Sequence, residues 1–95
     1  MHYYPLASGD NRIGSERGNG VILAVRGVSR EHALLCLGSD GLTIEDLGSK
    51  NGTRVGNTRV TAPSPLADGD ELTFGSVVVT FRAWAADPTL TEGGA

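Results

Sequence analysis

The sequence predicts an all-β fold, an antiparallel β-sandwich formed by one small domain. No stretch of ten or more residues keeps apolar side chains at helical spacing, whereas short runs of β-branched residues recur between turn residues. Short strands with such even spacing are typical of a sandwich. With 95 residues, of which 39% are hydrophobic, the chain has room for a single modest core.

Nine strands are expected, because nine apolar or β-branched runs are separated by residues that favour turns. They cover residues 3–6, 11–14, 21–23, 32–37, 42–46, 53–55, 58–60, 71–74 and 77–82. The pair Asp40-Gly41 suits a tight hairpin turn, and Asp68-Gly69 and Gly75-Ser76 mark two further turns.

The later part of the chain contains a repeated triplet and two irregular stretches. The two copies of TRV, at 53–55 and 58–60, are predicted to be the arms of one hairpin joined by Gly56-Asn57. The stretch TAPSPLADGD at 61–70 contains two prolines and few strand formers, so we expect an irregular connection there. The last ten residues, ADPTLTEGGA, are predicted to be a flexible tail or linker, which places the domain at 1–85 and the tail at 86–95.

The start of the chain is short. Only twelve residues precede Ile13, which predicts a truncated first strand. A sheet that lacks part of an edge strand exposes unpaired backbone N–H and C=O groups, and these favour pairing with a neighbouring chain. We therefore expect some homodimer to form through this sheet edge.

Charge and composition exclude several functional classes. Residues 1–60 carry a net charge of +1 and residues 61–95 carry −4, which is too weakly basic for non-specific binding to nucleic acid. No apolar run reaches the roughly 20 residues of a membrane span, and no secretory signal is seen, so we expect a cytoplasmic protein without membrane contacts. The single cysteine, Cys36, is predicted to be a small buried residue, and neither a metal nor another cofactor is expected.

Three loops between predicted strands are rich in groups that bind anions: 14–20, 27–32 and 47–53. Glycines let backbone N–H groups converge, hydroxyls donate to phosphate oxygens, and Lys or Arg adds a charge-assisted bond. Neither a dinucleotide fingerprint nor a nucleotide P-loop fits, because the glycine spacing differs and no helix follows. Together, the loops indicate a phosphate site at one end of the sandwich.

The motifs VSREHALL and EDLGSKNGTRV, followed by LADGDELTFG, resemble the forkhead-associated (FHA) domain. The pattern of that family runs G-R, S-R-x-H, S-x-N-G-T and then G-D before a late strand, and the resemblance covers roughly residues 3–82. It implies a non-catalytic β-sandwich that recognises a phosphothreonine-containing peptide or protein through loops at one end.

The resemblance also implies roles for individual residues. Ser29 matches the serine whose hydroxyl binds phosphate, and Arg30 matches a position that contacts the peptide. Lys50 occupies a position that commonly reaches the phosphate, and Asn51 matches the asparagine that bonds the peptide backbone. The structural matches are Gly14, His32 as a buried brace of the loop, Gly52 and Thr53.

One residue departs from the family pattern, because Ser15 stands where the phosphate-binding arginine should follow Ile13 and Gly14. Loss of one charged hydrogen bond weakens binding by roughly ten- to a hundredfold. Arg17, in the same loop, is the candidate substitute. The alternatives are a module that binds its partner without phosphate, or a structural or regulatory unit of a larger signalling or transcription-regulating protein.

Two remoter hypotheses complete the set. Ser29, His32 and Asp46 supply the residue types of a hydrolase triad, but no nucleophile elbow is present and a sandwich of this size has little room for a substrate cleft. Thr89 and Thr91 lie in the predicted tail, where a phosphorylated threonine would be able to dock on the domain's own pocket. A non-catalytic interaction module remains the main prediction.

Overall fold

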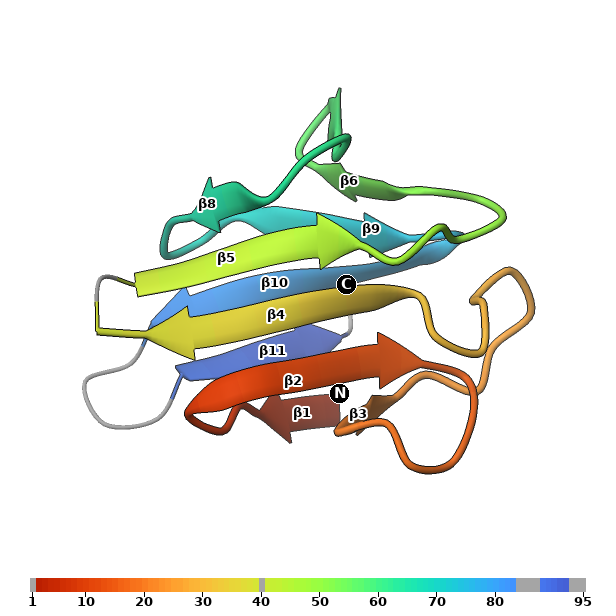
Figure 1. Cartoon of the computed structure of the whole chain (residues 1–95), viewed down its shortest axis with the longest axis horizontal. Coiled ribbons are helices and arrows are strands. Elements are labelled where there is room, and N and C mark those ends of the chain that lie inside the picture. Colours follow the sequence, from red (N-terminus) through yellow and green to blue (C-terminus); the bar gives the residue numbers. More distant parts are fainter. Residues whose placement is uncertain (1, 40, 84–87, 93–95) are drawn as a thin grey trace.

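The computed structural model describes residues 2–39, 41–83 and 88–92, which form two β-sheets packed face to face (Figure 1). The six strands of the first sheet, in spatial order, are β1 (His2–Pro5), β11 (Pro88–Glu92), β10 (Val77–Ala83), β9 (Glu71–Phe74), β6 (Thr53–Val55) and β7 (Thr58–Arg59). The five strands of the second are β3 (Val21–Ile22), β2 (Gly9–Gly14), β4 (Ala33–Gly38), β5 (Gly41–Asp46) and β8 (Ser64–Leu66). Neighbouring strands are antiparallel except for β2 and β3, which pair in parallel. The predicted sandwich is therefore confirmed.

The core lies between the two sheets and follows the period-two alternation of the strands. In β4 and β5 every second side chain points inward, so Leu35 and Ile44 are fully buried, and from the facing sheet they meet Leu72, Phe74 and Leu90. Burial of each such side chain contributes about 1.5–3 kcal/mol. The same alternation turns Cys36 outward, where it is only partly buried, so its predicted burial is wrong.

The predicted hairpins of the first sheet are confirmed by their register. Val55 lies opposite Thr58, so the two TRV triplets flank a two-residue turn at Gly56-Asn57. In the same way Phe74 lies opposite Val77 across Gly75-Ser76.

Two strands were not expected from the sequence. β8 forms within the stretch predicted to be irregular, because an edge strand tolerates Pro65, which has no N–H to donate. The prediction of a flexible tail is wrong for residues 88–92, because β11 pairs with β1 on one side and β10 on the other. Thr89 in this strand is buried, which corrects the docking hypothesis for it. Residues 84–87 and 93–95, with the predicted boundary at 85, lie outside the described residues.

β1 lies at the edge of the first sheet, where β11 is its one partner among the described strands. The hydroxyl of Tyr4 donates to Oε1 of Glu92 at 2.7 Å and fastens this edge strand to its neighbour. Burial, followed by that hydrogen bond and the nearby carboxylate charge, raises the pKa of Tyr4 to about 12.

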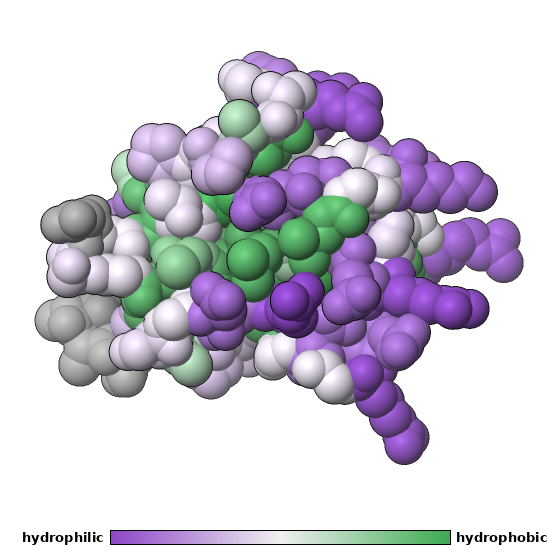
Figure 2. Space-filling model, in the orientation of Figure 1, coloured by the Kyte–Doolittle hydropathy of each residue, from purple (hydrophilic) through white to green (hydrophobic). Residues whose placement is uncertain are grey.

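The loops predicted to bind an anion gather at one end of the sandwich, on the right of Figure 1, together with the turn between β9 and β10. Long hydrophilic side chains project from this end in Figure 2. Among the described residues, no helix has the length and apolar character needed to cross a membrane.

Candidate functional site

His32 joins two loops at this end of the sandwich. Its side chain is fully buried, and its Nδ1 accepts a hydrogen bond from the backbone N–H of Ser29 at 3.0 Å. Since Nδ1 accepts, the ring proton sits on Nε2, which donates to the carbonyl oxygen of Gly52 at 2.8 Å. The ring also packs edge-on against Phe74, with centroids 5.7 Å apart. The Ser29 loop and the 47–52 loop are thus held at a fixed separation.

Asp46, at the end of β5, organises the 47–52 loop. One carboxylate oxygen accepts from the backbone N–H groups of Gly48 and Ser49 at 3.0 Å, and the other accepts from the hydroxyls of Ser49 and Thr53 at 2.6 Å. Burial of the carboxyl acts to raise the pKa of Asp46, but the four hydrogen bonds outweigh it and hold that pKa below its ordinary value of 3.8. The Ser49 hydroxyl in turn accepts from the N–H of Gly52 at 2.9 Å.

Ser29, Lys50 and Asn51 come together across these two loops. The backbone N–H of Lys50 donates to Oγ of Ser29 at 3.0 Å, which occupies one acceptor site of that hydroxyl and leaves its proton available to an anion. Nδ2 of Asn51 donates to the carbonyl oxygen of Gly27 at 2.9 Å. The two loops therefore form one surface.

A hollow of about 290 Å³ lies on this surface. Its lining residues are Arg26, Gly27, Val28, Ser29, Lys50 and Asn51. Two cationic residues, a serine and an asparagine are among them, and no Asp or Glu of the described residues lines this hollow. This chemistry suits an anion such as a phosphate group.

The other predicted site residues do not line the hollow. The backbone N–H of Ser15 donates to the carbonyl oxygen of Ser29 at 3.0 Å, so Ser15 lies next to the Ser29 loop. Arg30 is mostly exposed, and its Nε lies 3.8 Å from Oε2 of Glu16. Arg17 is exposed on the 15–20 loop. Gly14 packs against the carbonyl of Arg30 so closely that any Cβ would overlap it.

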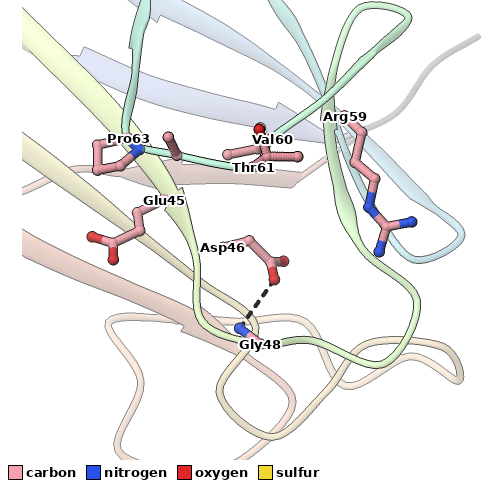
Figure 3. A pocket seen from close by; sticks show the side chains of 8 residues that line it. Glu45, Asp46, Gly48, Arg59, Val60, Thr61 and Pro63 are labelled. Carbon is pink, nitrogen blue, oxygen red and sulfur yellow. Dashed lines mark hydrogen bonds between the residues drawn. The ribbon is translucent and has the colours of Figure 1, made fainter.

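A larger hollow, of about 420 Å³, lies between the end of β5 and the connection from β7 to β8 (Figure 3). Glu45 and Asp46 contribute carboxylates to its wall, and in Figure 3 Asp46 is bonded to the N–H of Gly48. Arg59 stands at the other side with its guanidinium over Gly52. The two carboxylates repel a phosphate, so the smaller cationic hollow is the better anion site despite its size.

The residue types of a hydrolase triad do not form a triad. The ring nitrogens of His32 bond the N–H of Ser29 and the carbonyl of Gly52, so neither faces the Ser29 hydroxyl. Both carboxylate oxygens of Asp46 accept hydrogen bonds from Gly48, Ser49 and Thr53. Neither His32 nor Asp46 is therefore placed to act as the base that would activate Ser29 as a nucleophile.

This geometry agrees with comparisons to known proteins. The sequence signature described as "FHA domain" matches residues 11–75, which is more than half of the chain. The chain belongs to the FHA domain family. FHA domains are interaction modules without a catalytic function. In one solved relative, the interactions of the FHA domain depend on phosphothreonine. That relative is 29% identical, with a TM-score of 0.70, and the match covers 95% of this chain and 82% of that one.

Two other relatives of this FHA domain, EmbR and the FHA-2 domain of Rv1747, come from Mycobacterium tuberculosis. The transcriptional regulatory protein EmbR is 34% identical over 91 residues, which are 96% of this chain and 22% of EmbR, so the FHA domain spans about a fifth of that relative. The FHA-2 domain of the ABC transporter Rv1747 is 32% identical, with a TM-score of 0.75 over 94% of this chain and 78% of that one. The FhaA FHA domain, solved with the intracellular domain of Rv3910, is 31% identical, with a TM-score of 0.71 over 92% and 84%.

Sequence reasoning missed two residues of the FHA domain's loop end. Arg26 lines the hollow, and the Ser76 hydroxyl donates to the carbonyl oxygen of Arg26 at 3.1 Å. The sequence did offer a signal for Arg26, because it is a cationic residue only three positions before Ser29. Ser76 is 50 positions away in the sequence, so nothing in its own surroundings indicated the contact.

Proposed function

We propose that this FHA domain recognises a phosphothreonine-containing peptide segment of a cytoplasmic partner through Ser29, Lys50 and Asn51. The observation that carries the proposal is the cationic hollow in which these three side chains meet. The Ser29 hydroxyl donates to the phosphate and Lys50 supplies positive charge. Asn51 bonds the backbone of the peptide, and Arg30, exposed at the rim, contacts residues beside the phosphothreonine.

Phosphate binding is weakened in this proposal because Ser15 stands at the family's arginine position. A serine hydroxyl contributes at most a neutral donor, whereas a guanidinium contributes charged and bidentate hydrogen bonds. We therefore expect the Ser15→Arg variant to bind a phosphothreonine peptide roughly ten- to a hundredfold more tightly than the wild type.

The test is fluorescence anisotropy with an oriented phosphothreonine peptide library and its unphosphorylated counterpart. Preference for the phosphorylated pool, lost in Ser29→Ala and weakened in Asn51→Ala, is the expected result. Equal affinity for both pools would instead support the alternative, a module that binds its partner without phosphate. No binding by either the wild type or Ser15→Arg would support a structural or regulatory unit of a larger protein.

We also propose that two copies pair weakly through β1, which lies at the edge of the first sheet. Pro5 removes one donor from this short strand, so the pairing is expected only at high concentration. Light scattering between micromolar and millimolar protein measures it. A mass that stays monomeric over this range would contradict the proposal.

A further inference from the structure

We propose that Arg26 supplies the guanidinium that binds the ligand's phosphate, in place of the arginine absent at position 15. This inference rests on the proposed function, because it concerns how the same hollow holds a phosphothreonine. It also assigns a different residue from Arg17, which the sequence alone favours because it lies in the same loop as Ser15.

The four cations on the loops differ in where they lie. Arg26 and Lys50 line the hollow beside Ser29, whereas Arg17 and Arg30 do not. Arg30 is already close to a carboxylate, that of Glu16 at 3.8 Å. Within residues 2–39, 41–83 and 88–92, no carboxylate forms an ion pair with Arg26. Arg26 is thus the one arginine of the loops that both lines the site and keeps its charge available.

The backbone fixes the position from which the Arg26 side chain extends. The N–H of Val28 donates to the carbonyl oxygen of Val25 at 3.1 Å and closes a turn with Arg26 and Gly27 at its corners. Gly27 has a φ of 98°, as the second corner of a type II turn requires. Arg26 occupies the first corner, so its side chain projects from a defined point.

Three contacts hold this turn against the rest of the loop end. The Ser76 hydroxyl donates to the carbonyl oxygen of Arg26, and Nδ2 of Asn51 donates to that of Gly27. Gly75 packs so closely on the Gly27 carbonyl that a side chain there would overlap it. The turn is therefore tied both to the 47–52 loop and to the β9–β10 turn, and Arg26 is held near Ser29 without a large loop movement.

The experiment measures the affinity of the wild type, Arg26→Ala, Arg26→Lys and Arg17→Ala for the oriented phosphothreonine library and its threonine counterpart. Arg82→Ala is the matched charge control, because Arg82 is exposed and lies near the end of β10 that is farther from the Gly75-Ser76 turn. Arg26 is exposed, so its variants should fold, and thermal unfolding checks this. In parallel, the arginine Nε–H resonances are followed by NMR during addition of the phosphothreonine peptides.

The expected result is a loss of roughly ten- to a hundredfold in Arg26→Ala, a smaller loss in Arg26→Lys, and changes within twofold in Arg17→Ala and Arg82→Ala. The Nε–H resonance of Arg26 should shift most. If Arg17→Ala abolishes binding and Arg26→Ala is neutral, the inference is wrong and the proposed function stands. If Arg26→Ala loses affinity for the phosphorylated and the unphosphorylated peptides by the same factor, the inference is also wrong, because Arg26 would then contact another part of the ligand. If the wild type binds neither pool, the proposed function itself fails.

Discussion

Replacement of Asp46 by Asn tests whether the Asp46 carboxylate holds the 47–52 loop in place. The carboxylate accepts four hydrogen bonds between 2.6 and 3.0 Å, two at each oxygen. An amide keeps one acceptor oxygen for the two N–H groups but carries no charge, and the hydroxyls of Ser49 and Thr53 must turn to accept from its NH₂ group, so four charge-assisted bonds become weaker neutral ones. Hydrogen bonds to a charged group contribute about 1.5–3 kcal/mol each, and partial exposure reduces this, so we expect a loss of about 2 kcal/mol in the free energy of unfolding.

Urea denaturation followed by circular dichroism at several pH values measures this loss. Because the pKa of Asp46 is lower in the folded than in the unfolded state, its contribution is fully present above pH 3.8 and disappears as the pH falls through the folded pKa. The wild type and the variant should therefore converge in strong acid. Asp68→Asn is the control, since among the described residues Asp68 accepts a single hydrogen bond, from the N–H of Ala83, and the variant should lose less than about 1 kcal/mol. Equal stabilities of wild type and Asp46→Asn at pH 7, or a difference that does not shrink as the pH falls below 3.8, would refute the reasoning.

Three further variants probe the rest of the fold. His32→Ala removes a buried ring with its two hydrogen bonds and leaves a cavity, so denaturation should report a loss of about 3–5 kcal/mol, and a loss below 1 kcal/mol would contradict the bracing role. In an ultraviolet titration, Tyr4→Phe should abolish the tyrosinate absorbance change that has its midpoint near pH 12. The stability that Tyr4 contributes is present below pH 10 and is lost as the pH rises through about 12. Gly75→Ala should weaken phosphothreonine-peptide binding, because its Cβ would displace Gly27, and unchanged affinity in calorimetry would show that the β9–β10 turn does not hold the loop.

Most of the fold was predictable because alternating burial and turn residues act locally. The two missed strands depend on tertiary context instead. β11 is short and begins with Pro88, yet burial of Leu90 between β1 and β10 stabilises it. β8 holds Pro65, which only its edge position tolerates.

The candidate site was predictable to the extent that its residues lie in short motifs. Ser29, Lys50 and Asn51 were identified and do meet at one hollow. Arg26 was missed because Arg17 lies in the same loop as Ser15 and was therefore preferred. Which side chains line one hollow depends instead on how turns from different strands pack together. The contact between Ser76 and Arg26 is an example, since it joins residues 50 positions apart.

The most direct test of the central claim is an NMR titration of the ¹⁵N-labelled domain with the oriented phosphothreonine library. We expect the largest amide shifts at residues 26–29 and 49–52, the two loops that form the cationic hollow, and no shift of these resonances with the unphosphorylated library. Shifts centred on the acidic hollow between β5 and the β7–β8 connection, or equal shifts with both libraries, would contradict it.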